Sequence, residues 1–301
     1  MLDARIGGSP LNVAIGLARL QQPVAFFGAL SSGFPGDRLL KALHDEAIDT
    51  QCIVRLQAPS TLSLVGLDAQ GVPSYAIYGE GAADRQLPLS ALAAVPPAQA
   101  YQFGSYAMVV EPVAGTQRDT LQWMLPRTHI LKISDEDLGL LCPGTATSDL
   151  AQQWLAAGVS LVVVTRDGQG AWGWTATHHI ATEPVSVAVV DTVSAGDSFQ
   201  ATLLTALAER GLLSPTALQG LGAASLHELL QLAVRCAAIT CSRRGADLPR
   251  RAELNQFSVG RHLAPGLIFH SDRAVSIAAT RSRPRCKAIA GFTPGWAMSA
   301  R

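Results

Sequence analysis

Two continuous apolar runs constrain the fold of this chain more than any other feature of its sequence. Residues 128–134 (THILKIS) and 159–165 (VSLVVVT) lack the polar alternation of a strand with one face in water. Such runs are typical of strands that are covered on both faces of a sheet. Residues 147–158, between them, have the spacing of an amphipathic helix. The sequence therefore predicts a parallel strand–helix–strand unit with a right-handed crossover.

Other segments extend this unit into an α/β protein. Residues 7–20 suggest a glycine turn followed by a helix, and an apolar strand is expected at 23–30. Residues 61–79 contain two short strands around an Asp-Ala-Gln-Gly turn, the local pattern of a hairpin, which would form a lid. We expect further helices at 37–47, 197–210 and 225–242, and a short strand pair near 171–189. Together these segments predict an α/β sandwich with a small β-lid.

The composition limits the classes of function. Of the 301 residues, 48% are apolar, which is enough for a large core. Basic and acidic residues number 23 each, so the net charge does not favour nucleic acid or an anionic membrane as a partner. The five cysteines are scattered and lack Cys-x-x-Cys spacing, which disfavours disulfides and zinc. Because no apolar run reaches the roughly 18 residues of a membrane span, and no signal-peptide core opens the chain, we expect a soluble cytoplasmic protein.

The last part of the chain differs in character. Between Arg261 and Arg301 there are seven Lys or Arg residues and one acid, Asp272, without a sustained hydrophobic period. A basic tail can bind nucleic acid or lipid. Without aromatic interleaving or amphipathic spacing, however, such a tail is more often poorly ordered. We therefore expect one domain over residues 1–254 and a poorly ordered tail over residues 255–301.

A polar turn follows the expected strand at residues 187–190. Residues 191–199 (DTVSAGDSF) place Ser194, Ala195 and Gly196 before a helix that carries Asp197 in its first turn. Unpaired N–H groups and the positive end of the helix dipole would form an anion hole there, suited to a transferring phosphoryl group. The same field would keep Asp197 ionised and able to accept a hydroxyl proton. Taken alone, the turn is better explained by Asp197 or Ser198 acting only as a helix cap, because such caps are far commoner than catalytic sites.

Three motifs with glycines occur in a fixed order along the chain. They are GGSPLNVAIGLARL (7–20), VVVTRDGQGAW (162–172) and DTVSAGDSF (191–199). In order and spacing they resemble the two signature regions and the nucleotide loop of the ribokinase-like (PfkB) carbohydrate kinases. LKISDEDL (131–138) and AAITCSRRGADLP (237–249) resemble the fructokinases of that family. The resemblance covers about residues 6–254 and implies a ribokinase-like αβα sandwich with a mostly parallel central sheet.

The resemblance implies roles for individual residues. Asp197 matches the catalytic base, and Ala195 and Gly196 match the backbone of the anion hole. The residues implied for sugar binding are Gly7, Gly8 and Asn12. Those implied for nucleotide binding are Thr165, Gly168, Gly170 and Ser194. Asp137 matches an acid that helps to hold Mg²⁺ through water, and Asp191 fits a monovalent-cation site. Two of these assignments have a structural alternative. Gly7 and Gly8 would then form only a helix-entry turn, and Asp137 would be only an acid that favours the start of a helix.

The implied activity is an ATP-dependent phosphorylation of a sugar hydroxyl. The resemblance favours fructose, giving fructose 6-phosphate, with 2-keto-3-deoxygluconate or another sugar as the alternative. It implies ATP and Mg²⁺ as cofactors, K⁺ as a further candidate, and a homodimer formed through the lid. A second hypothesis is a degenerate relative that binds nucleotide without catalysis. This hypothesis rests on three departures from the family. The strand with a sugar-binding acid that normally precedes the glycine pair is not found before Gly7, and residues 116–128 replace a longer segment that usually contains a further central strand. In addition, Ser194 and Asp167 stand where the family usually has glycine.

Overall fold

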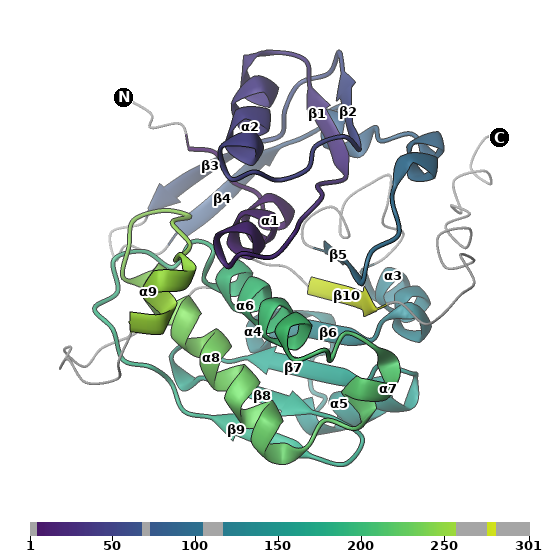
Figure 1. The fold of residues 1–301 in the computed structure, drawn as a ribbon, viewed down its shortest axis with the longest axis vertical. Coiled ribbons are helices and arrows are strands. Elements are labelled where there is room, and N and C mark those ends of the chain that lie inside the picture. The colour runs from purple at the N-terminus through teal and green to yellow at the C-terminus, as the bar shows by residue number, and fades with distance from the viewer. Residues whose placement is uncertain (1–4, 68–72, 105–116, 257–275, 281–301) are drawn as a thin grey trace.

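A six-stranded sheet forms the centre of the lower part of the molecule (Figure 1). The computed structural model describes residues 5–67, 73–104, 117–256 and 276–280. Strands β6 (Ile130–Ser134) and β7 (Leu161–Thr165) pair in parallel, and Ser134 lies beside Thr165. Every residue of β6 is buried, as are the first four residues of β7. The parallel unit predicted from the two apolar runs is therefore confirmed.

The remaining pairings in this sheet are antiparallel. The strand order is β5-β10-β6-β7-β8-β9, with β5 at Ala100–Gly104, β8 at Ala171–Trp174, β9 at His179–Thr182 and β10 at Ser276–Thr280. The sheet is thus mixed rather than mostly parallel. The chain segments that join β7, β8 and β9 are too short for the crossovers that parallel strands require, and β10 pairs antiparallel with both β5 and β6.

Strand β10 also changes the description of the expected tail. Residues 276–280 pair with β5 on one side and β6 on the other. The prediction of a poorly ordered tail is therefore wrong for these five residues, because their backbone groups are paired within the sheet. The expectation that residues 116–128 supply no strand agrees with the structure where it is described, since helix α3 (Gln117–Met124) and a 3-10 turn occupy this region. The rest of the tail beyond Gln256 lies outside the described residues.

Two hydrophobic cores, one on each face of the sheet, confirm the αβα sandwich. On one face, Ile130, Leu161 and Val163 pack with residues of helices α6 (Ala195–Glu209) and α8 (Ala223–Cys241). The β6 and β7 residues that alternate with these point to the other face, where they pack with residues of α3, α4 (Asp135–Leu141) and α5 (Thr147–Ala156). Figure 1 shows α6 and α8 crossing in front of the sheet, with α1 (Ser9–Arg19) next to α6.

The N-terminal part contributes a smaller layer and the lid. Strands β1 (Gly28–Ser31) and β2 (Ile53–Leu56) pair in parallel beside α2 (Phe34–Asp45). Strands β3 (Leu62–Leu67) and β4 (Pro73–Tyr78) form the antiparallel hairpin expected at 61–79. The other described elements are 3-10 turns and short helices: η1 Ala83–Arg85, η2 Leu89–Ala94, η4 Leu125–Arg127, η5 Asp167–Gln169, α7 Pro215–Gln219 and α9 Arg251–Gln256.

Two expected strands differ from the structure. Residues 187–190 are not a strand; the N–H groups of Val190 and Asp191 both donate to the carbonyl of Cys241, at the end of α8. Only Val187 of this run is deeply buried in the core that α6 and α8 share. The strand expected at 23–30 is restricted to β1, with an isolated bridge between Ala25 and Asp49. In both segments the apolar run indicates that some side chains are buried, but it does not indicate whether another strand lies alongside to pair with the backbone.

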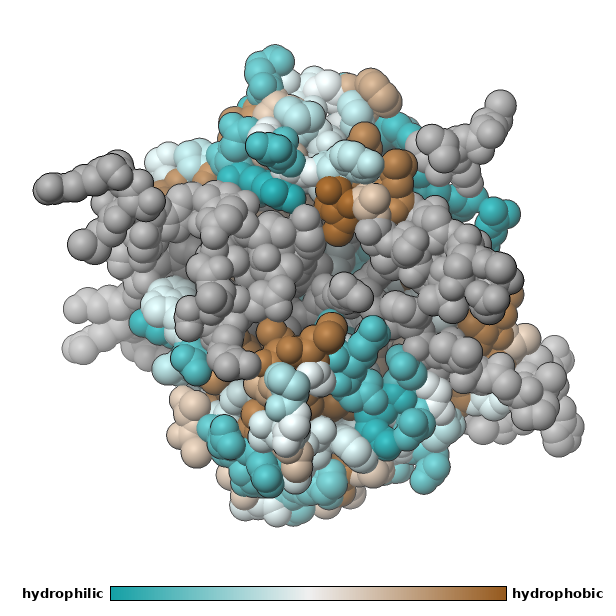
Figure 2. All heavy atoms as spheres, turned by 180° about the vertical axis from the view of Figure 1, so that it is seen from behind, coloured by the Kyte–Doolittle hydropathy of each residue, from teal (hydrophilic) through white to brown (hydrophobic). Residues whose placement is uncertain are grey.

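Hydrophobic residues reach the surface near the middle of the face shown in Figure 2, whereas the upper and lower ends of that face are largely hydrophilic. The lid exposes apolar side chains, because Leu62, Leu64, Ile77 and Tyr78 remain 40% to 62% exposed. Among the described helices, none has the length and apolar character that crossing a membrane demands.

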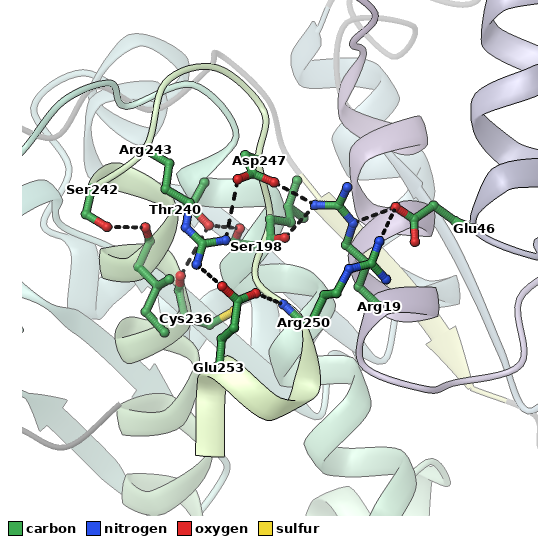
Figure 3. A network of polar contacts seen from close by, with 12 residues as sticks. Arg19, Glu46, Ser198, Cys236, Thr240, Ser242, Arg243, Asp247, Arg250 and Glu253 are labelled. Carbon is green, nitrogen blue, oxygen red and sulfur yellow. Dashed lines mark hydrogen bonds and ion pairs between the residues drawn. The ribbon is translucent and has the colours of Figure 1, made fainter. Parts of the chain in front are cut away.

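A network of ion pairs joins the C-terminal end of the domain to α1 and α2 (Figure 3). Arg19 donates to Glu46 at 2.7 Å, to Asp247 at 2.9 Å and to the Leu248 carbonyl at 2.6 Å. Arg243 pairs with Glu253 and Asp247 on the other side of the same loop. The side chains of Arg19 and Glu46 are only 18% and 11% exposed. This network fixes residues 243–253, which lie next to the site described below.

Replacing Arg19 by methionine should lower the free energy of unfolding by about 1–3 kcal/mol, because partly buried acceptors lose a charged donor. Lys41→Met is the matched control. Lys41 also pairs with an acid, Asp45, but the two side chains are 74% and 59% exposed, so the expected loss is within about 0.5 kcal/mol. Urea unfolding of both variants measures the difference. Equal losses would show that the Arg19 network contributes no more than a surface pair.

Candidate active site

Asp197 lies in the first turn of α6, where the backbone has an unusual conformation. The preceding N-cap residue, Ser194, is left-handed with φ 66° and ψ 14°. For a residue other than glycine this conformation costs about 1–2 kcal/mol. The Ser194 side chain does not cap the helix, so the positive end of α6 is not occupied by its own N-cap hydroxyl. Ser194, which replaces a glycine of the family, therefore stands at a position with positive φ.

Side chains from α1 and from the turn hold the Asp197 carboxylate. The Ser9 hydroxyl donates to Asp197 Oδ1 at 2.5 Å, and Asn12 Nδ2 donates to Oδ2 at 2.8 Å. Asn12 Nδ2 also donates to Ser194 Oγ at 2.7 Å, so both amide hydrogens have acceptors in this cluster. Asn12 and Asp197 are 4% and 5% exposed. The predicted sugar-binding and catalytic segments, far apart in the chain, thus meet in space.

Open space lies over the glycine turn that begins α1. Gly8 is the N-cap residue of α1 and has φ 125°, a conformation that favours glycine. A Cβ placed on Gly7 or on Gly8 would meet no atom of the described residues within 4 Å. Both residues are exposed. The turn is the entry to α1, as the alternative holds, and its backbone is also open to the approach of a ligand.

Lys132 belongs to the same site, although sequence reasoning did not select it. This residue lies in β6 and is only 3% exposed. A Cβ placed on Gly196 would lie 3.1 Å from Lys132 Nζ, so the ammonium group lies against the backbone of the α6 turn. A lysine within an otherwise apolar strand was the available signal, because a buried charge requires compensation. Ser9 was also missed, although it directly follows the glycine pair.

Burial and polar contacts act in opposite directions on the pKa of Asp197. Burial raises this pKa, while hydrogen bonds from Ser9, Asn12 and Ser194 and the charge of Lys132 lower it; the net shift is upward. The helix field alone favours the carboxylate, as expected from the sequence, but burial outweighs it. The larger effect of burial makes Asp197 a more basic carboxylate than an exposed aspartate.

The loop predicted to bind nucleotide follows β7. Thr165 ends the strand, and Asp167 adopts φ 42° at the position where the family has glycine. Gly168 lies within the 3-10 turn η5. Gly170, with φ 85°, has a structural explanation, because a Cβ there would lie 2.2 Å from the Thr182 carbonyl oxygen. Arg166 stacks over Trp172, 3.7 Å from the ring centroid, and fixes the loop against β8.

The two predicted metal-binding aspartates occupy different environments. Asp137 accepts a hydrogen bond from the Ser134 hydroxyl at 2.6 Å, and its N–H donates back to Ser134 Oγ at 3.1 Å. This reciprocal contact supports the alternative of a helix-start acid. Within the described part of the chain, no group of three or more His, Cys, Asp or Glu residues could hold a metal ion. Mg²⁺ would therefore take most of its ligands from phosphate and water, as it commonly does.

Asp191 connects the α6 turn to the loop after α8. Its Oδ1 accepts the Val193 N–H at 3.0 Å and its Oδ2 accepts the Gly245 N–H at 2.8 Å. Burial, followed by the charges of Asp191 and Asp167, raises the pKa of Cys241 to about 12. The two aspartates thus both act on the C-terminal end of α8. Asp167 of the predicted nucleotide loop and Asp191 therefore both lie near Cys241.

Comparisons with known proteins identify the family of this chain. The family model "pfkB family carbohydrate kinase" matches residues 2–116 and 97–253. A fructokinase from Rhizobium leguminosarum bv. trifolii is 30% identical over 239 residues, covering 69% of this chain and 73% of that protein. A probable fructokinase-4 from Arabidopsis thaliana is 26% identical over 292 residues, covering 84% and 87%.

Solved structures share the fold. A fructokinase with bound ATP from Xylella fastidiosa gives a TM-score of 0.71 at 23% identity, covering 83% of this chain and 89% of that one. A fructokinase from Vibrio cholerae O395, solved with fructose, ADP and calcium ion, gives a TM-score of 0.68 at 23% identity, covering 83% and 90%.

Proposed function

Because this chain belongs to the pfkB family of carbohydrate kinases, we propose that it phosphorylates fructose at its 6-hydroxyl with ATP. The observation that carries the proposal is the buried Asp197 at the start of α6, which α1 holds through Ser9 and Asn12. Fructose is favoured over 2-keto-3-deoxygluconate because the two curated relatives compared above are named as fructokinases.

In this proposal Asp197 is the general base. A sugar hydroxyl bound over Gly7 and Gly8 would replace Ser9 at Asp197 Oδ1 and pass its proton to that oxygen. The upward shift in the pKa of Asp197 assists the transfer, because it brings the base closer to neutral pH. The Ala195 and Gly196 backbone, at the positive end of α6, and the Lys132 ammonium would stabilise charge on the phosphoryl group.

The nucleotide and metal ions are assigned by the same reasoning. Thr165, Gly168, Gly170 and Ser194 would face ATP, and Asp137 would hold Mg²⁺ through water. When bound, Mg²⁺ neutralises phosphate charge in phosphoryl transfer. K⁺ is assigned to the neighbourhood of Asp191. Each Asp191 oxygen accepts one N–H and keeps lone-pair capacity for a cation.

A coupled ADP-release assay across a sugar panel tests the proposal. Fructose should give the highest kcat/KM, and the product should carry its phosphoryl group on the 6-hydroxyl. Higher kcat/KM for 2-keto-3-deoxygluconate or another sugar would reject fructose while keeping the kinase. Binding of MgATP by calorimetry without turnover of any sugar would support the alternative of a degenerate nucleotide-binding relative.

Turnover should be faster in K⁺ than in Na⁺ at equal ionic strength. A large cation beside Asp191 would order the turn that precedes α6, because this carboxylate already connects Val193 to Gly245. Asp191→Asn should remove the difference between the two salts, since the cation loses its charged ligand. Initial rates in KCl and NaCl measure the effect, and equal rates for the wild-type chain would count against this cation site.

We further propose a homodimer through the lid. Leu62 pairs with Tyr78 across the hairpin, and Leu64 lies two residues further along β3, so the three side chains share one face. They are 58%, 62% and 45% exposed. A second copy would cover this apolar face. Sedimentation of wild-type and Leu64→Ser chains tests this: the wild type should be dimeric and the variant shifted towards monomer, whereas a monomeric wild-type chain would reject the lid dimer.

A further inference from the structure

The Ser9 hydroxyl occupies the place that a substrate hydroxyl should take. It donates to Asp197 Oδ1 at 2.5 Å, while Asn12 occupies Oδ2. If Asp197 is the base, as the proposed function holds, Oδ1 is the oxygen that receives the proton of the attacking hydroxyl. The hydroxyl aligned with that oxygen in the structure belongs to Ser9.

The surroundings of Ser9 favour access by a phosphoryl group. Ser9 is the first residue of α1 and is only partly buried. No atom of the described residues lies within 4 Å of a Cβ placed on Gly7 or Gly8, so the turn before Ser9 is open on that side. Through its bond to Asp197, the hydroxyl also lies at the N-terminal turn of α6, a 15-residue helix, with the Lys132 ammonium against Gly196. An anion and this hydroxyl are therefore expected to share one site.

We propose that Ser9 is itself a phosphoryl acceptor, so that the chain phosphorylates Ser9 when MgATP is bound and sugar is absent. Ser9 Oγ attacks the γ-phosphorus, and the bond between that phosphorus and the bridging oxygen to the β-phosphate breaks. The electron pair of the broken bond leaves with ADP. The Ser9 proton moves to Asp197 Oδ1 and is then released to water. This step uses the same donor and base as the proposed function and therefore rests on it.

The modification would limit itself and would oppose the sugar reaction. A phosphoserine carries a charge of about −1.5 to −2 at neutral pH. On Ser9 this charge would lie beside the Asp197 carboxylate and over the glycine turn. Each chain would accept one phosphoryl group and would then bind sugar poorly. Fructose, by displacing Ser9 from Oδ1, would slow the modification.

Two neighbouring serines provide internal comparisons. Ser198 directly follows Asp197 but is fully buried, and its hydroxyl contacts Thr240 instead (Figure 3). Ser194 is 2% exposed, and its oxygen accepts a hydrogen bond from Asn12. Both are less accessible than Ser9. Phosphoryl transfer driven by this geometry should therefore be specific for Ser9.

Tryptic peptide mapping of the full chain tests the inference. The peptide of residues 6–19 contains Ser9 as its only hydroxyl side chain. After incubation with MgATP alone, mass spectrometry should find one phosphoryl group on this peptide, and fructose should slow its appearance. Asp197→Asn should lower the rate by about 10²–10⁴-fold, the usual contribution of a general base. An equal rate in that variant would reveal a contaminating kinase and would overturn the inference.

Parallel measurement of fructose turnover separates this inference from the proposed function. Fructose phosphorylation with an unmodified 6–19 peptide would overturn the inference alone, as would a phosphoryl group found on Ser194 or Ser198 instead. Phosphorylated Ser9 without fructose turnover would support the inference and reject fructose as the substrate. If neither Ser9 nor fructose is phosphorylated, both the inference and the proposed function are overturned.

Discussion

Asp197→Asn should reduce kcat for sugar phosphorylation by about 10²–10⁴-fold and leave the Kd for MgATP almost unchanged. Asparagine has nearly the shape of aspartate and can still accept from Asn12, while its NH₂ group can donate to Ser9. It cannot take the proton of a hydroxyl. Coupled assays give kcat and calorimetry gives Kd. Asp45→Asn is the matched control, because Asp45 is 59% exposed on α2 and should keep full activity.

The same variant should not lose stability at neutral pH. Burial raises the pKa of Asp197 in the folded chain above its ordinary value of 3.8. Its stabilising contribution is therefore complete below the unfolded pKa and is lost as the pH rises through the folded pKa. Asp197→Asn should thus have a Tm at or above that of the wild type at pH 7, with the difference shrinking in acid. A clearly lower Tm at pH 7 would show that the carboxylate stabilises the fold.

The residues of the candidate site could be predicted from the sequence because they stand in motifs that resemble those of the family. Ser194 and Asp167 replace glycines of the family, and both adopt positive φ. Asp197 and Asn12 were selected from motifs, and the structure joins them by a hydrogen bond. The apolar runs similarly identified β6 and β7, because burial on both faces leaves a continuous pattern.

Non-local pairings could not be predicted in the same way. Nothing in residues 276–280 indicates that they lie between β5 and β6, since this depends on edges supplied by distant segments. Residues 187–190 have a strand-like composition, yet their backbone contacts go to Cys241 instead of a strand. The position of Lys132 beside Gly196 likewise depends on how α6 packs on β6. Each case depends on a partner that the local sequence does not specify.

Lys132→Met should lower kcat by about 10²–10³-fold, the usual cost of removing one group that stabilises transition-state charge. Methionine keeps an unbranched apolar chain in the buried space of Lys132 but removes the ammonium beside the Gly196 backbone. Lys132→Arg keeps the charge and should retain more activity than Lys132→Met. Rates of both variants at saturating sugar and ATP measure this comparison.

The pH profile distinguishes this role from simple packing. The charge of Lys132 lowers the pKa of Asp197, against the larger upward effect of burial. Without that charge, the pKa of Asp197 should rise further, and the acid limb of kcat against pH should move to higher pH in Lys132→Met. A packing defect would lower kcat at every pH without moving the limb. An unmoved limb in Lys132→Met would therefore mean that Lys132 supports the fold of the α6 turn without acting electrostatically on the base.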